Sequence, residues 1–172
     1  GEFPHQPTPL IPEAEKTAEL IRSLMEQCKT ILGDEKKANM VLFRGYSRFH
    51  RFPSMGERFG LNPLAIASYP MYRGIARLLG MTVAPLTTTI DDEIQTLEQY
   101  YREYDFFFIH VKPTDSRGED GDFEAKVKVI EEVDTFIPRI TALNPDVLVV
   151  TGDHSTPAAL AGHSWHPVPA IL

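Results

Sequence analysis

The sequence predicts an α/β fold in which helices flank a mostly parallel sheet. Segments with the apolar spacing of helices alternate with short apolar runs, an order that is typical of strand–helix–strand units. Two of these runs, residues 105–111 and 146–150, are apolar almost throughout, as expected for strands that a parallel sheet buries on both faces. The chain has 172 residues, of which 42% are hydrophobic and 24% charged, so it can form one sizeable core or two small ones.

The first half of the chain contains one long helix and two strand candidates. Apolar residues recur at helical spacing from Glu13 to Leu32, and Gly33 marks the end of this helix. The short apolar runs 40–43 and 64–68 predict strands, and the second ends before Pro70 because proline cannot donate to a ladder. The alternation of helices and strands therefore begins in this half.

Two helices follow the second strand candidate. Residues 71–79 predict a helix that Gly80 closes, and residues 90–104 predict another. Thr89 and Asp92 have the spacing of a capping box, with Asp in place of the usual Glu. This pair predicts where the second helix begins.

The second half continues the alternation. The strand 105–111 leads into the polar sequence KPTDSRGEDGD, residues 112–122, which we interpret as a loop. Residues 123–143 predict a long helix that ends or kinks near Pro138, because a proline inside a helix removes a backbone hydrogen bond. Residues 146–150 predict a further buried strand, so four strands alternate with helices.

Charge and composition exclude several classes of protein. The net charge is -7 and the pI is about 5.3, which argues against sequence-independent binding of nucleic acid, because such binding needs basic surface. No apolar stretch reaches the roughly 18 residues of a membrane span, and the N-terminus lacks the features of a signal peptide. Cys28, the single cysteine, lies on an apolar helix stripe and indicates a small core residue in a reducing compartment. We therefore expect a cytoplasmic protein without a nucleic-acid or membrane partner, and the sequence leaves its oligomeric state open.

Polar side chains follow both of the predicted buried strands, at ends that a parallel sheet places along one edge. The sequence VVTGDHSTP, residues 149–157, places an Asp and a His after the strand 146–150. The loop 112–122 follows the strand 105–111, and GHSWHP at 162–167 adds a third polar segment. Together the three segments offer Asp115, Glu119, Asp120, Asp122, Asp153, His154, His163 and His166.

This mixture of carboxylates and imidazoles suits a divalent metal such as Mn²⁺ or Zn²⁺, whereas all-oxygen sites suit Ca²⁺ or Mg²⁺ better. The alternative for Asp153 and His154 is a turn with a capping role, and the alternative for the acidic segment is a solvated connection. Three such segments at one edge favour a site, because local turns do not require the same ligand chemistry three times. Residue type and spacing leave both interpretations open.

The amino-acid sequences of four segments are more specific than residue type and spacing, because they resemble a known family. VTGDHSTP, GHSWHPVP, HVKPTDSRGEDGDFEAKVKVIEEVD and LNPLAIASYPMYRGIARLLGM resemble the archaeal-type cofactor-independent phosphoglycerate mutases, members of the alkaline phosphatase superfamily. The resemblance covers most of the chain, including PLIPEAEKTAELI near its start. It implies an alkaline-phosphatase-like core, two divalent metal ions and a serine that is transiently phosphorylated. Its reaction would interconvert 3- and 2-phosphoglycerate in glycolysis and gluconeogenesis, without a bisphosphoglycerate cofactor.

The resemblance also implies which residues bind the metals, with Mn²⁺ favoured over Zn²⁺ or Mg²⁺. Asp153 and His154 would bind one ion, and Asp115 and His163 would bind the other. The family pattern TDxxGH has a His where this sequence has Glu119. That carboxylate either coordinates the same ion, which would shift its preference towards Mn²⁺ or Mg²⁺, or it faces solvent, and both interpretations stay open.

Basic residues are implied as contacts to the phosphorylated substrate. Arg73, in YPMYRG, matches a family position that contacts the phosphoryl group, and the basic segment 44–51 matches a stretch with substrate arginines. Arg44 is the best match in that segment, and a guanidinium suits bidentate contacts to carboxylate or phosphate. The alternative is a solvated surface segment. Lys112 and Lys126 could also contact phosphate, although solvation is the simpler interpretation.

Two histidines are expected to serve the site only indirectly. His110 lies inside the apolar strand 105–111, so we expect a core histidine bonded to backbone. His166 lies shortly after His163, and we expect it to support the ligands rather than bind a metal.

The resemblance further implies that the chain is a fragment of a longer enzyme. Residues 1–60 would be the C-terminal part of an inserted substrate-handling domain, and residues 61–172 would be part of the metal-binding core. The catalytic serine would lie upstream, so we assign no nucleophile here and expect the isolated chain to be inactive. Two alternatives stay open: a related metal-dependent phosphotransferase or phosphatase on another small phosphate ester, and a non-enzymatic half-domain that pairs with a partner chain.

Overall fold

The structure is a computed structural model that describes residues 5–43, 45 and 50–172. The chain divides into two compact units, residues 1–50 and residues 51–172. Within the described ranges, no helix is both long enough and apolar enough to cross a membrane.

The first unit is built around the predicted N-terminal helix. A short 3-10 helix, η1 (Pro12–Ala14), leads into α1 (Glu15–Leu32), which confirms the predicted helix and its end at Gly33. Ala18 and Met25 are buried and Cys28 is half-buried, whereas several other apolar side chains of α1 are exposed.

The strand predicted at residues 40–43 is wrong. These residues have no regular secondary structure, because a strand needs a neighbour for its backbone groups and no other described residue of this unit is in a strand. Arg44, our candidate for substrate binding, lies outside the described residues.

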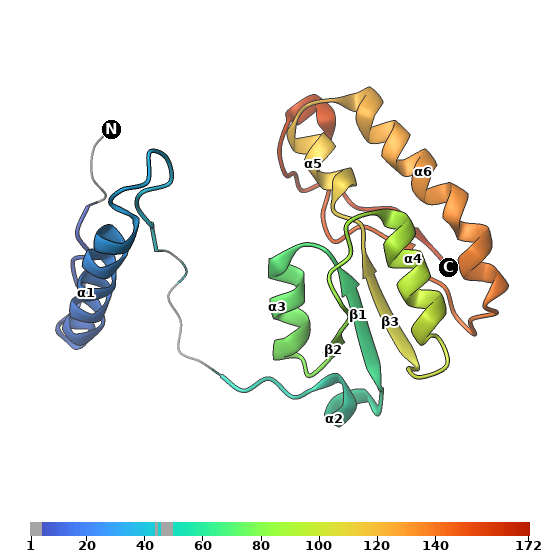
Figure 1. The fold of residues 1–172 in the computed structure, drawn as a ribbon, viewed down its shortest axis with the longest axis horizontal. Helices are drawn as coiled ribbons and strands as arrows, with labels where there is room; N and C mark the ends of the chain where they lie inside the picture. Colours follow the sequence, from blue (N-terminus) through green and yellow to red (C-terminus); the bar gives the residue numbers. More distant parts are fainter. Residues whose placement is uncertain (1–4, 44, 46–49) are drawn as a thin grey trace. The chain divides into compact units, whose positions relative to one another are not determined.

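The second unit contains a three-stranded parallel sheet in the order β2-β1-β3 (Figure 1). The strands are β1 (Pro63–Ala67), β2 (Thr82–Val83) and β3 (Phe106–His110). The register of β1 on β3 runs from Pro63 opposite Phe106 to Ala67 opposite His110. The strands predicted at 64–68 and 105–111 are therefore confirmed, whereas the two-residue β2 was too short for a pattern to predict.

Most of the helices of this unit also follow the prediction. They are α2 (Met55–Phe59), α3 (Pro70–Leu78), α4 (Ile90–Tyr100), α5 (Pro113–Glu119) and α6 (Phe123–Ala142). The capping box at the start of α4 is present, since the Thr89 hydroxyl accepts from the Asp92 backbone and the Asp92 carboxylate from the Thr89 backbone. Gly80 follows α3 with a φ of 71°, a conformation that a glycine adopts without strain.

The loop predicted directly after β3 is wrong, whereas the long helix predicted after it is present. The polar segment 112–122 is not a loop, because α5 occupies most of it and begins with Pro113, which suits the first turn of a helix. Helix α6 confirms the helix predicted at residues 123–143, although it continues through Pro138 to Ala142 instead of ending near the proline. The contacts between α5 and α6 stabilise the first of these helices, and the cap from the Asp122 carboxylate satisfies a backbone N–H at the start of the second.

Side chains alternate between the two faces of the sheet and divide the core in two. Leu64 and Ile66 pack with Leu97 of α4 and with residues at the end of α6. Ala65 lies on the other face, with Ala76 of α3 and the following Met81. Helices therefore flank both faces of a parallel sheet, as predicted (Figure 1).

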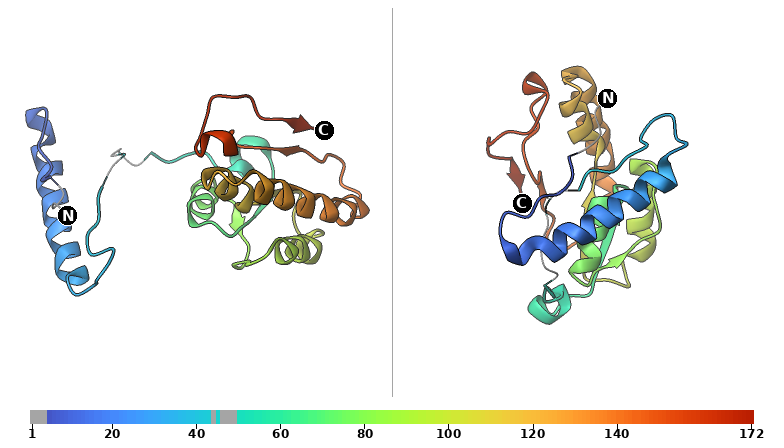
Figure 2. Two further views of the ribbon diagram at one scale, coloured as in Figure 1. Left: turned by 90° about the horizontal axis from the view of Figure 1, so that it is seen from above. Right: turned by 90° about the vertical axis from the view of Figure 1, so that its left-hand side faces the viewer.

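The predicted buried strand at residues 146–150 is wrong. Only its last residue is in a strand, β4 (Val150–Thr151), which pairs antiparallel with β5 (Ala170–Ile171) in a separate two-stranded sheet (Figure 2). Val147 and Val149 are 67% and 54% exposed. An apolar run is buried only where other elements cover it, and in the described part of the chain this run does not join the parallel sheet.

Strand β3 is likewise less buried than its sequence suggested. Phe106 is exposed and the rest of the strand is half-buried. It forms one edge of the parallel sheet, so its apolar side chains have neighbours on one side of the strand alone.

Candidate metal centre

The candidate site lies where three segments meet beyond β3 and β4. Asp115 lies in α5, which follows β3, while Asp153 and His154 follow β4. His163 follows η2 (Ala158–Leu160), a short 3-10 helix that contacts α5. The segments that the sequence placed at one edge are therefore brought together.

Hydrogen bonds from Lys126 and close packing at Gly118 hold the first two segments together. The Lys126 ammonium donates to the carbonyl oxygens of Thr114, at 3.1 Å, and Thr156, at 2.9 Å, which ties α6 to the start of α5 and to the segment after β4. Gly118 packs so closely on Thr156 that a Cβ at this position would overlap the Thr156 carbonyl oxygen. Lys126 and Gly118 therefore set the distance between the first two segments.

A backbone bridge brings in the third segment. Ser155 and Ser164 form an isolated antiparallel bridge, in which the Ser164 N–H donates to the Ser155 carbonyl at 2.9 Å. The Ser155 hydroxyl also donates to the His166 carbonyl at 2.7 Å. This bridge places His163 beside His154, with the centroids of the two rings 4.1 Å apart.

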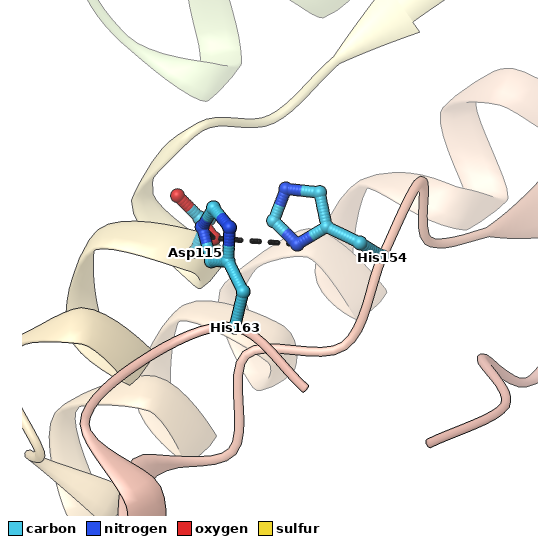
Figure 3. A group of neighbouring side chains, drawn as sticks. All are labelled: Asp115, His154 and His163. Carbon is cyan, nitrogen blue, oxygen red and sulfur yellow. Dashed lines mark ion pairs between the residues drawn. The ribbon is translucent and has the colours of Figure 1, made fainter. Parts of the chain in front are cut away.

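Three side chains form the tightest group of potential ligands. Asp115, His154 and His163 each offer a ligand atom, and these atoms all lie within 4.8 Å of one another (Figure 3). Oδ1 of Asp115 lies 3.9 Å from Nδ1 of His154 and 3.6 Å from Nε2 of His163. One carboxylate and two imidazoles at these separations fit a divalent metal ion.

The other two predicted ligands extend this group on either side. Glu119 approaches His163, with Oε1 and Nε2 3.4 Å apart, and Asp153 approaches His154, with Oδ2 and Nε2 3.5 Å apart. All five predicted metal ligands therefore lie in one cluster. We expected His154 to share an ion with Asp153, but the tightest trio groups it with Asp115 and His163.

Asp115 is the most enclosed of these ligands, and it is ionised. The Lys112 ammonium pairs with its Oδ2, and the Thr156 hydroxyl donates to its Oδ1 at 2.5 Å. Burial acts to raise the pKa of Asp115, but the hydrogen bonds from Lys112 and Thr156 outweigh it and hold the pKa below its ordinary value. Lys112 is thus a partner of the carboxylate in this structure.

Asp153 is held by a tyrosine that the sequence did not single out. The Tyr72 hydroxyl donates to its Oδ2, and the His154 backbone N–H donates to its Oδ1 at 3.0 Å. Burial raises the pKa of Asp153, but these bonds and the nearby His154 lower it overall. Burial and the carboxylate both raise the pKa of Tyr72, so its hydroxyl keeps its proton.

His110 supports that tyrosine. Its ring stacks on Tyr72 with centroids 3.7 Å apart. Burial lowers the pKa of His110, so the ring is neutral at neutral pH. Its Nδ1 has no hydrogen-bond partner among the described residues.

Arg73 and His166 are not brought into the cluster. The Arg73 guanidinium donates to the carbonyl oxygens of Ala67, at 2.9 Å, and Ala84, at 3.0 Å. It therefore joins the end of β1 to the segment after β2. His166 is exposed, and its Nδ1 lies 2.8 Å from the Ser164 hydroxyl.

Sequence reasoning missed Tyr72 and Thr156. Thr156 lies in the same short motif as Asp153 and His154, so its position was a usable signal. Tyr72 lies 81 residues before Asp153, and no local pattern connects the two.

A family model described as the metalloenzyme superfamily matches residues 23–172. The chain is 51% identical over 173 residues to a probable 2,3-bisphosphoglycerate-independent phosphoglycerate mutase of Aquifex aeolicus, covering 100% of this chain and 42% of that protein. It is 52% identical over 159 residues to the protein of the same name from Thermotoga maritima, covering 92% of this chain and 40% of that protein. The chain thus spans about two fifths of the length of these curated relatives.

Two solved structures share the fold. A protein from Pyrococcus horikoshii superposes with a TM-score of 0.76 at 25% identity, over 92% of this chain and 48% of that one. A cofactor-independent phosphoglycerate mutase from Thermoplasma acidophilum superposes with a TM-score of 0.55 at 21% identity, over 86% and 41% of the two chains. The second likeness concerns the fold alone.

Proposed function

This chain belongs to the metalloenzyme superfamily, and we propose that it is part of a metal-dependent phosphoglycerate mutase that interconverts 3- and 2-phosphoglycerate in glycolysis and gluconeogenesis. The observation that carries the proposal is the cluster of Asp115, His154 and His163 at the meeting point of three segments. The two curated relatives named above carry that activity in their names and match 100% and 92% of this chain. The cytoplasm is the compartment we propose for it.

We further propose that the full-length enzyme holds two divalent ions, with Mn²⁺ preferred. Asp153 and His154 would hold one ion, and Asp115, Glu119 and His163 would hold the other. When bound, such a pair of ions stabilises charge on the attacking and leaving oxygens of a phosphoryl group and activates a serine hydroxyl, which here would lie outside this chain. Glu119 supports the choice of Mn²⁺ or Mg²⁺ over Zn²⁺, because its oxygen is a harder ligand than an imidazole nitrogen.

The residues of this chain prepare the site before any ion arrives. Tyr72 and Thr156 orient Asp153 and Asp115, and the Lys112 ammonium balances the charge of the Asp115 carboxylate. With a metal ion held by Asp115, the Lys112 ammonium would be available to meet an anionic phosphoryl group. The contact of Lys112 with Asp115 supports a role in substrate binding, because a lysine that only faced solvent would not pair with a metal ligand.

We propose that arginines hold the substrate. The Arg73 guanidinium uses two of its N–H groups on backbone carbonyls, so its remaining donors could reach a phosphoryl oxygen while the side chain is held in place. Arg44 remains our candidate for the carboxylate or phosphate of the substrate. In this proposal residues 1–60 are the end of an inserted substrate-handling domain, and residues 61–172 are part of the metal-binding core.

One observation favours a second candidate function. Glu119 stands where the family pattern has a histidine and lies 3.4 Å from His163, so the site could serve a phosphatase or phosphotransferase that acts on another small phosphate ester. The two functions differ in where the phosphoryl group goes. A mutase returns it to the same glycerate, whereas a phosphatase releases inorganic phosphate.

The test uses the full-length protein, stripped of metal and reloaded with Mn²⁺. Incubation with 3-phosphoglycerate should yield 2-phosphoglycerate without release of inorganic phosphate, and Asp115→Asn should abolish the conversion. Asp120→Asn is a matched control, because this neighbouring carboxylate pairs with Arg117 outside the cluster. Phosphate release from another ester, with no conversion of 3-phosphoglycerate, would favour the second function instead.

A further inference from the structure

A single hydroxyl lies between the two ligand sets. Thr156 is only 4% exposed, and its Oγ1 donates to Oδ1 of Asp115 at 2.5 Å. The same oxygen lies 3.1 Å from Nδ1 of His154. Thr156 therefore contacts one residue from each of the two sets proposed above.

The hydrogen-bonding capacity of these groups fixes the direction of each bond. An ionised carboxylate only accepts hydrogen bonds, so the single hydroxyl proton of Thr156 points to Asp115. Towards His154 the threonine oxygen can then only accept. Nδ1 of His154 must carry the ring proton, which leaves the lone pair on Nε2.

Among the described residues, the opposite tautomer has no comparable partner. A proton on Nε2 would face Oδ2 of Asp153, but those atoms are 3.5 Å apart, and that oxygen already accepts from Tyr72. The contact from Nδ1 to Thr156 is shorter, at 3.1 Å. The geometry therefore favours the proton on Nδ1.

The tautomer decides which ion His154 can bind. Nδ1 lies 3.9 Å from Asp115, in the tight trio with His163, whereas Nε2 lies next to Asp153. A proton on Nδ1 blocks coordination within the trio and leaves Nε2 free to join Asp153. If Nδ1 carried no proton, Asp115, His154 and His163 could together bind one ion, and the site would hold one ion where two are proposed.

We propose that Thr156 is a positioning residue that assigns His154 to the metal set of Asp153 by keeping the ring proton on Nδ1. This inference rests on the two-ion site proposed above, and it extends that proposal to a residue that binds no metal itself. The same hydroxyl holds Asp115 in the other set, so one side chain separates the two sets.

The first test is nuclear magnetic resonance of the metal-free full-length protein, with histidines labelled with ¹⁵N, at a pH where His154 is neutral. The His154→Gln variant assigns its signals. We expect Nδ1 to be protonated and Nε2 to be free. A predominant Nε2–H tautomer in the wild-type protein would overturn the proposal, and this result depends on neither metal binding nor activity.

The second test compares Mn²⁺ binding by calorimetry in the variants Thr156→Val and Thr156→Ser. The valine matches the shape of threonine without its hydroxyl, and we expect at least a tenfold loss of affinity for one of the two ions, while serine restores it. Thr141→Val is the matched control, because the Thr141 hydroxyl bonds to carbonyl oxygens of its own helix and lies outside the cluster. Unchanged binding of both ions by Thr156→Val would contradict the proposal.

The two tests separate this inference from the proposed function. A wild-type protein that binds no divalent ion would refute the two-ion site and with it the assignment of His154 to an ion. The spectrum of the metal-free protein would still decide where the ring proton lies. If two ions bind but the tautomer is Nε2–H, the function stands and the role of Thr156 is refuted.

Discussion

The Tyr72 hydroxyl donates a hydrogen bond to Oδ2 of Asp153, a residue 81 positions later in the chain, while its ring stacks on His110. This contact links α3 and β3 to the segment after β4. A metal ligand held in this way needs little reorganisation when an ion binds. Tyr72 therefore connects the fold of the parallel sheet to the candidate site.

Tyr72→Phe should weaken metal binding while the fold persists. Phenylalanine keeps the stack on His110 and removes only the bond to Asp153, so we expect a severalfold to tenfold loss of Mn²⁺ affinity and about 1 kcal/mol of stability. Calorimetry and chemical denaturation of the full-length protein measure the two effects. Tyr101→Phe serves as control, because Tyr101 stacks on Phe107 on the sheet face that α4 covers. Equal Mn²⁺ affinity in both variants would remove Tyr72 from the site.

Gly118→Ala should disturb the cluster through backbone displacement. The added Cβ would overlap the Thr156 carbonyl oxygen, which Lys126 holds in place, so α5 and the segment after β4 must move apart. We expect a loss of about 1–3 kcal/mol in stability and weaker metal binding, because Asp115 and Thr156 separate.

Gly74→Ala is the matched control for this prediction. A Cβ at Gly74 meets no atom within 4 Å, and the residue lies inside α3, so alanine should raise stability by about 0.5–1 kcal/mol. The unfolding free energies from denaturant titration distinguish the two variants. Stabilisation by both alanines would show that the contact between Gly118 and Thr156 is looser than described.

Glu93 should make stability depend on pH near neutrality. Its side chain is 4% exposed, and burial raises its pKa from 4.5 to about 7. Between these values the folded protein holds a proton that the unfolded chain lacks, so unfolding releases it. The contribution of protonated Glu93 to the free energy of unfolding is complete below pH 4.5. It is lost as the pH rises through 7, by about 3 kcal/mol in total.

Unfolding free energies at pH 5, 6, 7 and 8 test this prediction on Glu93→Gln, which stays neutral throughout. The difference between variant and wild type should grow in favour of the variant as the pH rises, since the amide never ionises. Glu103→Gln, at an exposed position, is the control. Parallel stability curves for wild type and Glu93→Gln would contradict the raised pKa.

Local patterns predicted those parts of the fold that local physics determines. The capping box of Thr89 and Asp92 is formed by neighbours in sequence, and β1 is an apolar run that other described elements cover on both faces. The run 146–150 has a similar composition but different neighbours, so its burial could not be read from its own residues. For α5, a helix start at Pro113 was visible, but the polar composition favoured a loop.

In the candidate site, the sequence likewise predicted some residues and not others: it predicted the ligands but not the residues that orient them. Asp115, Asp153, His154 and His163 were predicted because strand ends were expected to gather at one edge and because their motifs resemble a known family. The segment after β4 reaches Asp115 although β4 lies in a separate sheet. The residues that orient them depend on tertiary contacts. Tyr72 reaches Asp153 only through the packing of α3 on the sheet, which no sequence spacing encodes.

A chain limited to these 172 residues should bind metal weakly and catalyse nothing. The proposed serine would lie outside it, so the set of Asp153 and His154 would be incomplete, and we expect about one weakly bound ion. A coupled assay for 2-phosphoglycerate measures activity. Turnover of 3-phosphoglycerate by this chain alone would contradict the fragment interpretation.

The central claim is that five clustered side chains form two metal sites, and the most direct measurement is the number of Mn²⁺ ions bound per full-length chain. We predict two ions in the wild-type protein, one in Asp153→Asn, one in His163→Ala and two in the control Asp120→Asn. Each ligand variant loses an ion because it removes a ligand from one set and leaves the other intact. A single ion in the wild-type protein, lost on replacement of Asp115, His154 or His163 but retained by Asp153→Asn, would contradict the account and identify the tight trio as the whole site.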